Sequence, residues 1–296
     1  MSSLVKFNNP ILKKIINVYQ PNYKNLVAQG FGDFLRGCFC IYQICKIHGL
    51  EFDMDLSNHP MHKLLDTPPT EYNYSNIDRN NISWFPNPNY IPTSPTTFVK
   101  DSLHFHNEFI RHLNKIKERN YYLFCNSFPI FNFVQDIART TISNKILPNP
   151  EVKKEIENMM YNLHLFRKNF SVIHIRTGDA YLLNKNTLNI ELIQKIMNIV
   201  NPYINIKKKK YLILSDNNKI KYFFRNYPNC IFNVKSITHL GENGDKAEDK
   251  IKNTLIDFYV MGQANYIISL SPYNWGSGFS HWCSVLYKIP YKSFMI

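Results

Sequence analysis

The stretch SVIHIRTGDAY, residues 171–181, combines residue types that could do chemistry with the ending of a strand-like run. A β-branched apolar segment leads directly into His174, Arg176, Gly178 and Asp179. In doubly wound sheets, ligands bind at the carboxyl ends of parallel strands, and the planar fork of Arg176 fits two phosphate oxygens. His174 lies two residues earlier and therefore on the same side of the strand. The alternative is structural: an Arg176–Asp179 ion pair beside a core histidine.

A second candidate is GFGDFLRG, residues 30–37, in which a glycine loop runs into a predicted helix. Gly30 and Gly32 would leave backbone N–H groups and the positive end of the helix dipole open to an anionic or polyhydroxyl ligand. The spacing matches neither the dinucleotide-binding GxGxxG nor a P-loop, which needs Lys followed by Ser or Thr. The alternative is that Asp33 only caps the helix.

A third candidate is GSGFSH, residues 276–281, which follows an apolar strand and begins the last predicted helix. Ser277 and Ser280 place hydroxyls beside free helix N–H groups, an arrangement that can hold a phosphate. An ordinary serine N-cap is the competing interpretation.

The fourth candidate, Asp257, interrupts the apolar helical segment TLIDFYVMGQA. A buried carboxylate needs a partner, and the adjacent N1–H and N2–H donors of guanine would suit its two oxygens. A solvated helix face would explain the same residue without a ligand.

The second half of the chain must position most of these residues. Apolar runs of strand length alternate there with helical patterns, which predicts βαβ units and a parallel sheet that is buried on both faces. The predicted strands are 170–175, 211–215, 230–234 and 265–270, and the predicted helices are 151–167, 189–200, 218–227, 248–264 and 278–289.

The first half is less regular. We expect a helix over 11–18, a helix after the glycine loop, a strand within 120–128 and a helix within 129–147. Residues 57–100 are rich in Pro, Asn and Tyr. They predict a long ordered loop that covers a site or contacts a partner, or else a poorly structured insertion.

Composition limits the function classes. The formal charge of +13 suits a polyanionic ligand such as nucleic acid, a membrane surface or a phosphate-bearing small molecule, but no RNP motif or zinc finger supports nucleic acid. The six cysteines form no CxxC pair and indicate reduced, buried thiols of an intracellular protein. No apolar run is long enough for a membrane span, and no secretory signal is visible, so we expect a cytoplasmic protein.

Taken in order, these motifs resemble those of the fucosyltransferase superfamily, which includes the α1,6- and nodulation enzymes, the plant α1,2-fucosyltransferases and the protein O-fucosyltransferases. GFGDFLRG resembles the superfamily's glycine loop, HIRTGD its His-x-Arg motif, and LILSDN (212–217) the strand that ends in Ser/Thr-Asp-Asp/Asn. IDFYVMGQANYIISL, followed by SGFSHW, resembles the last motif. The resemblance covers mostly residues 170–290.

The resemblance implies an α/β, GT-B-like fold of two Rossmann-like domains that face a cleft. Residues 1–165 would form the acceptor-side domain, with the insertion 57–100, and residues 166–296 the nucleotide-sugar-binding domain. The implied activity is an inverting transfer of fucose from GDP-fucose to a hydroxyl of a glycan or glycoprotein, with no metal ion or other cofactor.

The resemblance also implies roles for individual residues. Arg176 would bind the β-phosphate, and His174 and Asp257 would recognise guanine. Asp216 would lie near the nucleoside. The remaining donor-side residues would be Ser277, Phe279 and Ser280 at the diphosphate, with Gly30, Gly32 and Asp33 facing the sugar and acceptor.

One departure concerns the catalytic base. Some α1,6 enzymes carry Lys and Glu where this chain has Ala180 and Asn184. We therefore expect Asp33 to accept the proton of the acceptor hydroxyl, with Asp179 as the second candidate. Three other functions stay open: a transferase that uses another GDP-sugar, an inactive GDP-sugar- or glycan-binding module of the same fold, and a nucleic-acid-binding protein.

Overall fold

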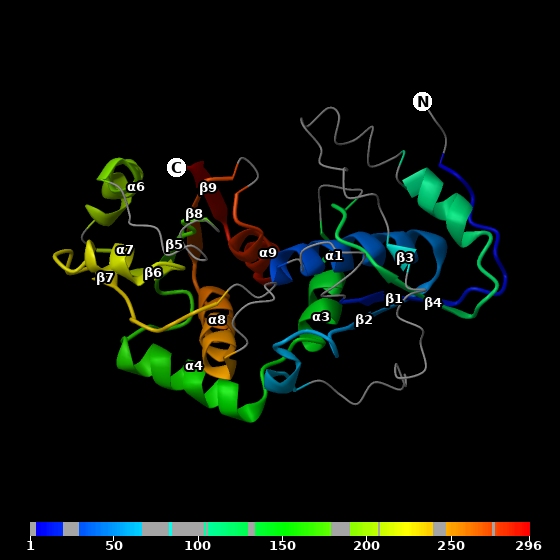
Figure 1. Ribbon diagram of the computed structural model, residues 1–296, viewed down its shortest axis with the longest axis horizontal. Coiled ribbons are helices and arrows are strands. Elements are labelled where there is room, and N and C mark those ends of the chain that lie inside the picture. The colour runs from blue at the N-terminus through cyan, green and yellow to red at the C-terminus, as the bar shows by residue number, and fades with distance from the viewer. Residues whose placement is uncertain are drawn as a thin grey trace. The chain divides into compact units, whose positions relative to one another are not determined.

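The computed structural model describes the chain in two compact units. One unit contains Met1–Gln29 and Asp33–Leu147, and the other contains Gly30–Gly32 and Pro148–Ile296. The division therefore falls earlier than the expected boundary at 165/166, because helix α4 (Pro150–Asn162) packs on α8 (Glu248–Met261) (Figure 1). The described residues are 4–19, 30–66, 83–84, 104, 106–129, 134–178, 190–206, 208–238, 247–273 and 276–296.

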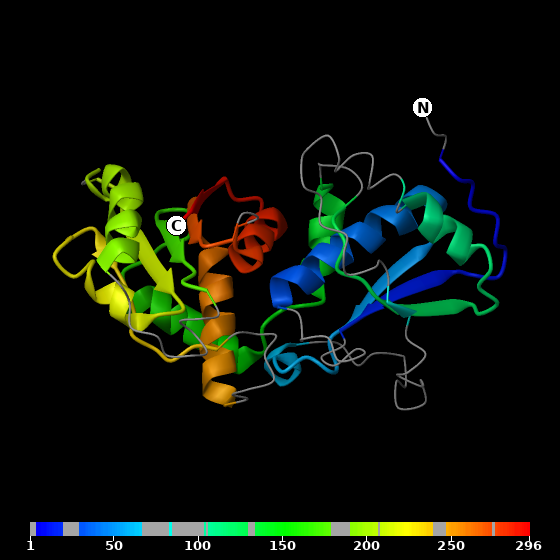
Figure 2. The same cartoon turned by 45° about the horizontal axis from the view of Figure 1, so that its top comes forward.

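The first unit is built on a parallel sheet in the order β2-β1-β4-β3. Figure 2 shows β1 lying between β2 and β4. The strands are β1 (Lys14–Val18), β2 (Glu51–Asp55), β3 (Ser83–Trp84) and β4 (Asn120–Phe124), and the helical elements include α1 (Phe31–His48), η1 (His62–Leu64) and α3 (Asp136–Asn144).

The expected helix over 11–18 is wrong, because Lys14–Val18 forms strand β1. Ile15, Ile16 and Val18 are all buried, and their β-branched side chains favour a strand over a helix. A central strand that is covered on both faces shows no alternation of polar and apolar residues, so the apolar run alone did not distinguish the two structures.

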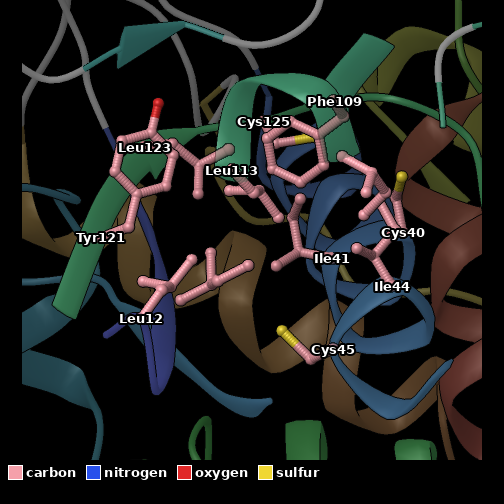
Figure 3. Close-up of a cluster of buried hydrophobic side chains, with 12 residues drawn as sticks. Leu12, Cys40, Ile41, Ile44, Cys45, Phe109, Leu113, Tyr121, Leu123 and Cys125 are labelled. Atoms are coloured by element: carbon pink, nitrogen blue, oxygen red, sulfur yellow. The ribbon is translucent and has the colours of Figure 1, made fainter. Parts of the chain in front are cut away.

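The core of the first unit lies between this sheet and α1. Figure 3 shows Ile41 and Ile44 of α1 pointing toward Leu12, Tyr121 and Leu123. Gly37 brings the helix close to the backbone, since a Cβ at this position would lie 1.7 Å from the carbonyl oxygen of Cys125. All six cysteines of the chain are free and buried, as expected.

The insertion at 57–100 is described only in part. The structure places η1 and residues 57–66 there, together with strand β3. The expectation of a covering loop otherwise falls on residues outside those that the structure describes.

The second unit is built on a five-stranded parallel sheet in the order β7-β6-β5-β8-β9. Its strands are β5 (Ser171–Ile175), β6 (Tyr211–Ser215), β7 (Cys230–Ile231), β8 (Tyr266–Ser271) and β9 (Tyr291–Met295). Every residue of β5 and β6 is buried, which confirms the prediction of a parallel sheet covered on both faces. The edge strand β9 was not predicted, because its sequence YKSFM has no continuous apolar run.

Helices follow the strands of the second unit as the sequence predicts. They are α6 (Ile190–Ile204), α7 (Asn218–Tyr222) and α9 (Gly278–Tyr287), in addition to α4 and α8. Helix α4 starts where Asn149 accepts a hydrogen bond from the Val152 N–H (2.9 Å), with Pro150 in the first turn. Within the described residues, no helix combines the length and apolar character that a bilayer crossing requires.

Candidate functional site

The strand order of the second sheet reverses direction at β5. From β5 the chain proceeds to β6 and β7 on one side, and then returns to β8 and β9 on the other. The segments that leave β5 and β8 therefore diverge from neighbouring strands at the carboxyl edge of the sheet. Such a switch point is where open α/β sheets bind ligands. The predicted motif at 171–181 begins with β5, and the motif at 276–281 follows β8.

Arg176 is held at the carboxyl end of β5 by an ion pair with Asp216. Its Nη1 lies 3.2 Å from Oδ2 of Asp216, and the two side chains are only 13% and 4% exposed. The Thr177 N–H and hydroxyl both donate to Oδ1 of the same carboxylate, at 2.8 Å each. Burial raises the pKa of Asp216, whereas Arg176 and Thr177 oppose that rise. Asp216 therefore orients the guanidinium of Arg176.

His174 precedes Arg176 in the strand and is buried at 7% exposure. Its Nδ1 atom has no hydrogen-bond partner among the described residues. Burial, together with the charges of Arg176 and Lys221, lowers the pKa of His174 to about 3, so the ring is neutral at pH 7. An unsatisfied buried polar atom costs free energy unless a ligand or water satisfies it.

Asp257 interacts with two lysines. Burial raises the pKa of its carboxyl from 3.8 to about 6, while Lys221 and Lys235 lower it. Lys221 interacts in turn with both Asp257 and Asp216. Arg176, Asp216, Lys221 and Asp257 thus form one connected set of charges, which we call the charge cluster. The carboxylate of Asp257 is ionised at neutral pH and accepts no hydrogen bond from the described residues.

Helix α9 begins beside the end of β8. Ser277 is the N-cap residue, yet its side chain makes no capping hydrogen bond. The hydroxyl of Ser280 is fully buried and donates to the hydroxyl of Ser269 on β8 (2.9 Å), so it ties the helix to the sheet. The N–H groups of the first turn have no partner inside the helix and mark the positive end of its dipole.

The predicted glycine loop contributes a close backbone contact to this helix start. Gly30–Gly32 group with the second unit, and a Cβ on Gly32 would lie 2.4 Å from the carbonyl carbon of Gly278. Any side chain at position 32 would therefore collide with backbone.

Phe279 lies in the first turn of α9 and packs against His174, with ring centroids 5.8 Å apart. It also contacts Phe258 (5.3 Å), and Phe258 contacts Phe31 (5.1 Å). These rings give an apolar wall beside the buried imidazole.

The structure places the two candidate bases differently. Asp33 lies in the first turn of α1, not at the cap, and its Oδ1 is 3.0 Å from Nη1 of Arg36. Its side chain is 37% exposed. Asp179 lies outside the described residues, so the alternative Arg176–Asp179 ion pair is not described either; Arg176 pairs instead with Asp216.

Sequence reasoning overlooked two members of this site. Thr177 lies within the predicted motif, and its hydroxyl and N–H are those that hold Asp216. The sequence did not identify Lys221 as a site residue, because its segment NKIKYFFRNY has two lysines at positions typical of a solvated helix. Only the fold shows that Lys221 is the buried one of the two.

Comparison with known proteins gives matches among solved structures. No protein-family model matches the sequence, and no curated protein matches it. The fucosyltransferase NodZ from Bradyrhizobium has a TM-score of 0.56 at 13% identity, and the match covers 96% of each chain. A structure of NodZ α1,6-fucosyltransferase soaked with GDP-fucose has a TM-score of 0.57 at 13% identity and covers 96% of this chain and 95% of that one.

A plant protein matches to a similar extent. A mutant of Arabidopsis thaliana FUT1 in complex with GDP has a TM-score of 0.55 at 8% identity, and the match covers 95% of this chain and 70% of that one. The chain is thus an α/β protein with parallel sheets and has the fold of these solved GT-B fucosyltransferases.

Proposed function

We propose that this protein is a glycosyltransferase that moves fucose from GDP-fucose to a hydroxyl group of a glycan or a protein, with inversion and without a metal ion. The proposal depends chiefly on one observation: the Arg176–Asp216 ion pair follows strands β5 and β6, where the strand order of the second sheet reverses. The solved NodZ structure that was soaked with GDP-fucose has the same fold, which supports this choice of donor.

The diphosphate would be bound by Arg176 and by the start of α9. As the glycosidic bond breaks, negative charge grows on the leaving GDP, and preorganised donors stabilise it. The guanidinium of Arg176 is already oriented by Asp216 (3.2 Å), and the first-turn N–H groups of α9 supply a further positive end. In this mechanism these groups do the work that a metal ion does in other transferases.

Guanine would be recognised by Asp257 and His174. The ionised carboxylate of Asp257 offers two acceptors to the N1–H and N2–H of guanine. The Nδ1 atom of His174 is buried without a described partner, so a base edge would satisfy it. Phe279, which packs on His174, would contribute an apolar surface to the same nucleotide.

In this mechanism Asp33 is the general base that accepts the proton of the acceptor hydroxyl. The carboxylate is accessible, at 37% exposure, and Arg36 fixes its orientation in the first turn of α1. General-base catalysis typically contributes about 10²–10⁴-fold to the rate. An Asp33→Asn variant with undiminished turnover would remove this residue from the mechanism.

A nucleotide panel tests the proposal. We expect GDP and GDP-fucose, but not UDP or ADP, to raise the melting temperature of the purified protein, and we expect slow release of fucose from GDP-fucose. Stabilisation by GDP without any release of fucose would favour a binding module or another GDP-sugar as donor. Stabilisation by oligonucleotides that disappears with added salt would favour a nucleic-acid ligand and contradict the proposal.

Removal of the guanidinium should have a specific effect. We expect Arg176→Ala to lower GDP affinity by about 100-fold or more, because a charge-assisted bidentate contact is lost and Asp216 keeps an uncompensated charge. Isothermal calorimetry measures this change. The matched control is Arg225→Ala, which removes an exposed arginine of the same unit and should leave the affinity unchanged.

A further inference from the structure

Thr177 follows Arg176 after the end of β5, and its side chain points at a buried carboxylate. Only 3% of Thr177 is exposed. Its N–H and its hydroxyl both donate to Oδ1 of Asp216, at 2.8 Å each, although 39 positions separate the two residues in the sequence. Oδ2 of the same carboxylate lies 3.2 Å from Nη1 of Arg176. The two oxygens of Asp216 therefore have different partners, and we call the three residues the Thr177–Asp216–Arg176 network.

The backbone on both sides of this network is fixed to the sheet. The N–H of Arg176 donates to the carbonyl oxygen of Leu270 in β8 (2.9 Å). Asp216 directly follows Ser215, the last residue of β6, and the Ser215 hydroxyl accepts from the N–H of Asn217 (3.1 Å). Arg176 is thus joined to β8 through its backbone and to the end of β6 through its side chain.

The second partner of the carboxylate fixes its orientation. The terminal torsion of an aspartate is broad, so an ion pair alone would let the carboxylate of Asp216 rotate about its Cβ–Cγ bond. The two donors of Thr177 on Oδ1 oppose this rotation and keep Oδ2 directed at the guanidinium. Hydrogen bonds to an ionised acceptor are stronger than those between neutral groups. The network can therefore orient Arg176 before any ligand binds.

We propose that Thr177 is a positioning residue for the diphosphate: it fixes the Asp216 carboxylate, which in turn directs the Arg176 guanidinium toward the β-phosphate of GDP. This inference rests on the proposed GDP-binding function. A nucleoside monophosphate lacks the phosphate that Arg176 would bind. The preference for a diphosphate over a monophosphate would therefore depend on a hydroxyl group that acts through two other side chains.

Removal of the hydroxyl at nearly constant side-chain shape tests the inference. In Thr177→Val, we expect the GDP affinity to fall about tenfold or more, the effect of losing a hydrogen bond to a charged group. The affinity for GMP should not change, because GMP has no β-phosphate. Thr177→Ser keeps the hydroxyl and should bind GDP as wild type does. Isothermal calorimetry with the two nucleotides measures these affinities.

A double variant shows whether Thr177 acts through the carboxylate. In an Asp216→Ala background the acceptor is gone, so the further change Thr177→Val should cost no additional GDP affinity. Equal losses in the two backgrounds would overturn the inference. The matched control is Ser171→Ala at the other end of β5, where a buried hydroxyl donates to Oδ1 of Asn265 (2.9 Å). This control should leave the ratio of GDP affinity to GMP affinity unchanged.

A measurement without ligand separates this inference from the proposed function. Nitrogen NMR relaxation of the Arg176 Nε–H group reports its mobility, with Arg176→Lys to assign the signal, and we expect higher mobility in Thr177→Val than in wild type. Unchanged mobility would overturn the inference even if wild type binds GDP. Higher mobility in a protein whose wild type does not bind GDP would overturn the proposed function and the phosphate role of Thr177, but not its effect on Arg176.

A variant that fails to fold does not end the test. Thr177→Ala also removes the hydroxyl and places no additional methyl group against the carboxylate, so it should show the same loss of GDP affinity at unchanged GMP affinity. Circular dichroism checks that the variants are folded. A ratio of GDP affinity to GMP affinity in Thr177→Ala equal to that of wild type would contradict the inference.

Discussion

The two sheets differ in how a buried polar residue at the same position of a central strand is hydrogen-bonded. Asn17, the next-to-last residue of β1, accepts from the Cys125 N–H (2.8 Å) and donates to the Cys125 carbonyl (3.2 Å) and to Sγ of Cys38 (3.3 Å). His174, the next-to-last residue of β5, keeps a buried Nδ1 that no described residue satisfies. Both residues are buried, polar and at the carboxyl end of a parallel strand.

This difference separates a structural polar group from one that is available to a ligand. Asn17 joins β1 to the residue that follows β4, so its hydrogen bonds contribute to folding. The buried Nδ1 of His174 leaves hydrogen-bonding capacity unused among the described residues, and it therefore reduces stability in the absence of a ligand. The comparison predicts that removing a structural polar group lowers the free energy of unfolding, whereas removing a polar group of the ligand site raises it.

The largest expected effect is on acid stability, through His174. The unfolded histidine binds a proton near pH 6.5, whereas the folded one does so only near its pKa of about 3. The unfolded state thus binds more protons between pH 6.5 and 3.5. The free energy of unfolding therefore decreases by about 4 kcal/mol as the pH is lowered from 6.5 to 3.5. Urea unfolding of His174→Gln across this range should lack that decrease.

The matched control for this prediction is the exposed His104. His104→Gln should keep the acid dependence of wild type. If the curves for His174→Gln and wild type ran parallel from pH 6.5 to 3.5, the buried imidazole would not be the source of the acid sensitivity, and the contrast with Asn17 would lose its basis.

The second prediction concerns the satisfied position. Asn17→Ala should lower the free energy of unfolding by about 3 kcal/mol, because it leaves the N–H and carbonyl of Cys125 buried without their partner. GDP affinity should stay as in wild type. Asn144→Ala, at an exposed position of α3, should change stability by about 0.5 kcal/mol or less. A loss of GDP affinity in Asn17→Ala would contradict the proposal that Asn17 is structural and does not contribute to ligand binding.

The smallest of these effects has the opposite sign. Because the pKa of Asp257 is raised from 3.8 to about 6 in the folded protein, its carboxyl contributes stability below pH 3.8 that is lost as pH rises through 6. Asp257→Asn should therefore be more stable than wild type at pH 7, by about 2 kcal/mol, and should no longer bind GDP. Thermal unfolding and calorimetry measure the two quantities.

Helix α8 offers a control for that variant. The Asp249 side chain is 91% exposed, and Asp249→Asn should alter neither stability nor GDP binding. An Asp257→Asn protein that is less stable than wild type at neutral pH would mean that this carboxylate is structural, like Asn17.

Much of the second sheet was predictable because its strands are covered on both faces. Apart from His174, the runs at 171–175 and 211–215 have polar residues only at their ends, so their boundaries can be read from the apolar pattern. The same rule failed for 14–18, where the polar residues Lys14 and Asn17 interrupt the apolar run. The edge strands β2 and β9 have polar, exposed positions and give no such signal.

Site residues were predictable only where a chemically reactive or charged residue lies at the end of a predicted strand. Arg176 and His174 follow from the motif itself, but the partner of Arg176 is Asp216, which lies 40 residues further along the chain. That pairing requires the register of β5 and β6, in which Ile175 lies beside Ser215. Lys221 requires the packing of α7 as well, and one sequence contains no information on which lysine turns inward.

The burial of all six thiols has a practical consequence for experiments on this protein. Reagents such as maleimides react with exposed thiolates, and burial raises the pKa of thiols such as that of Cys45. A single cysteine introduced at an exposed position, for example in place of Lys219, would then be the preferred point of attachment for a fluorescent dye. Ligand binding at the neighbouring strand ends can be followed through such a dye while every native cysteine is kept.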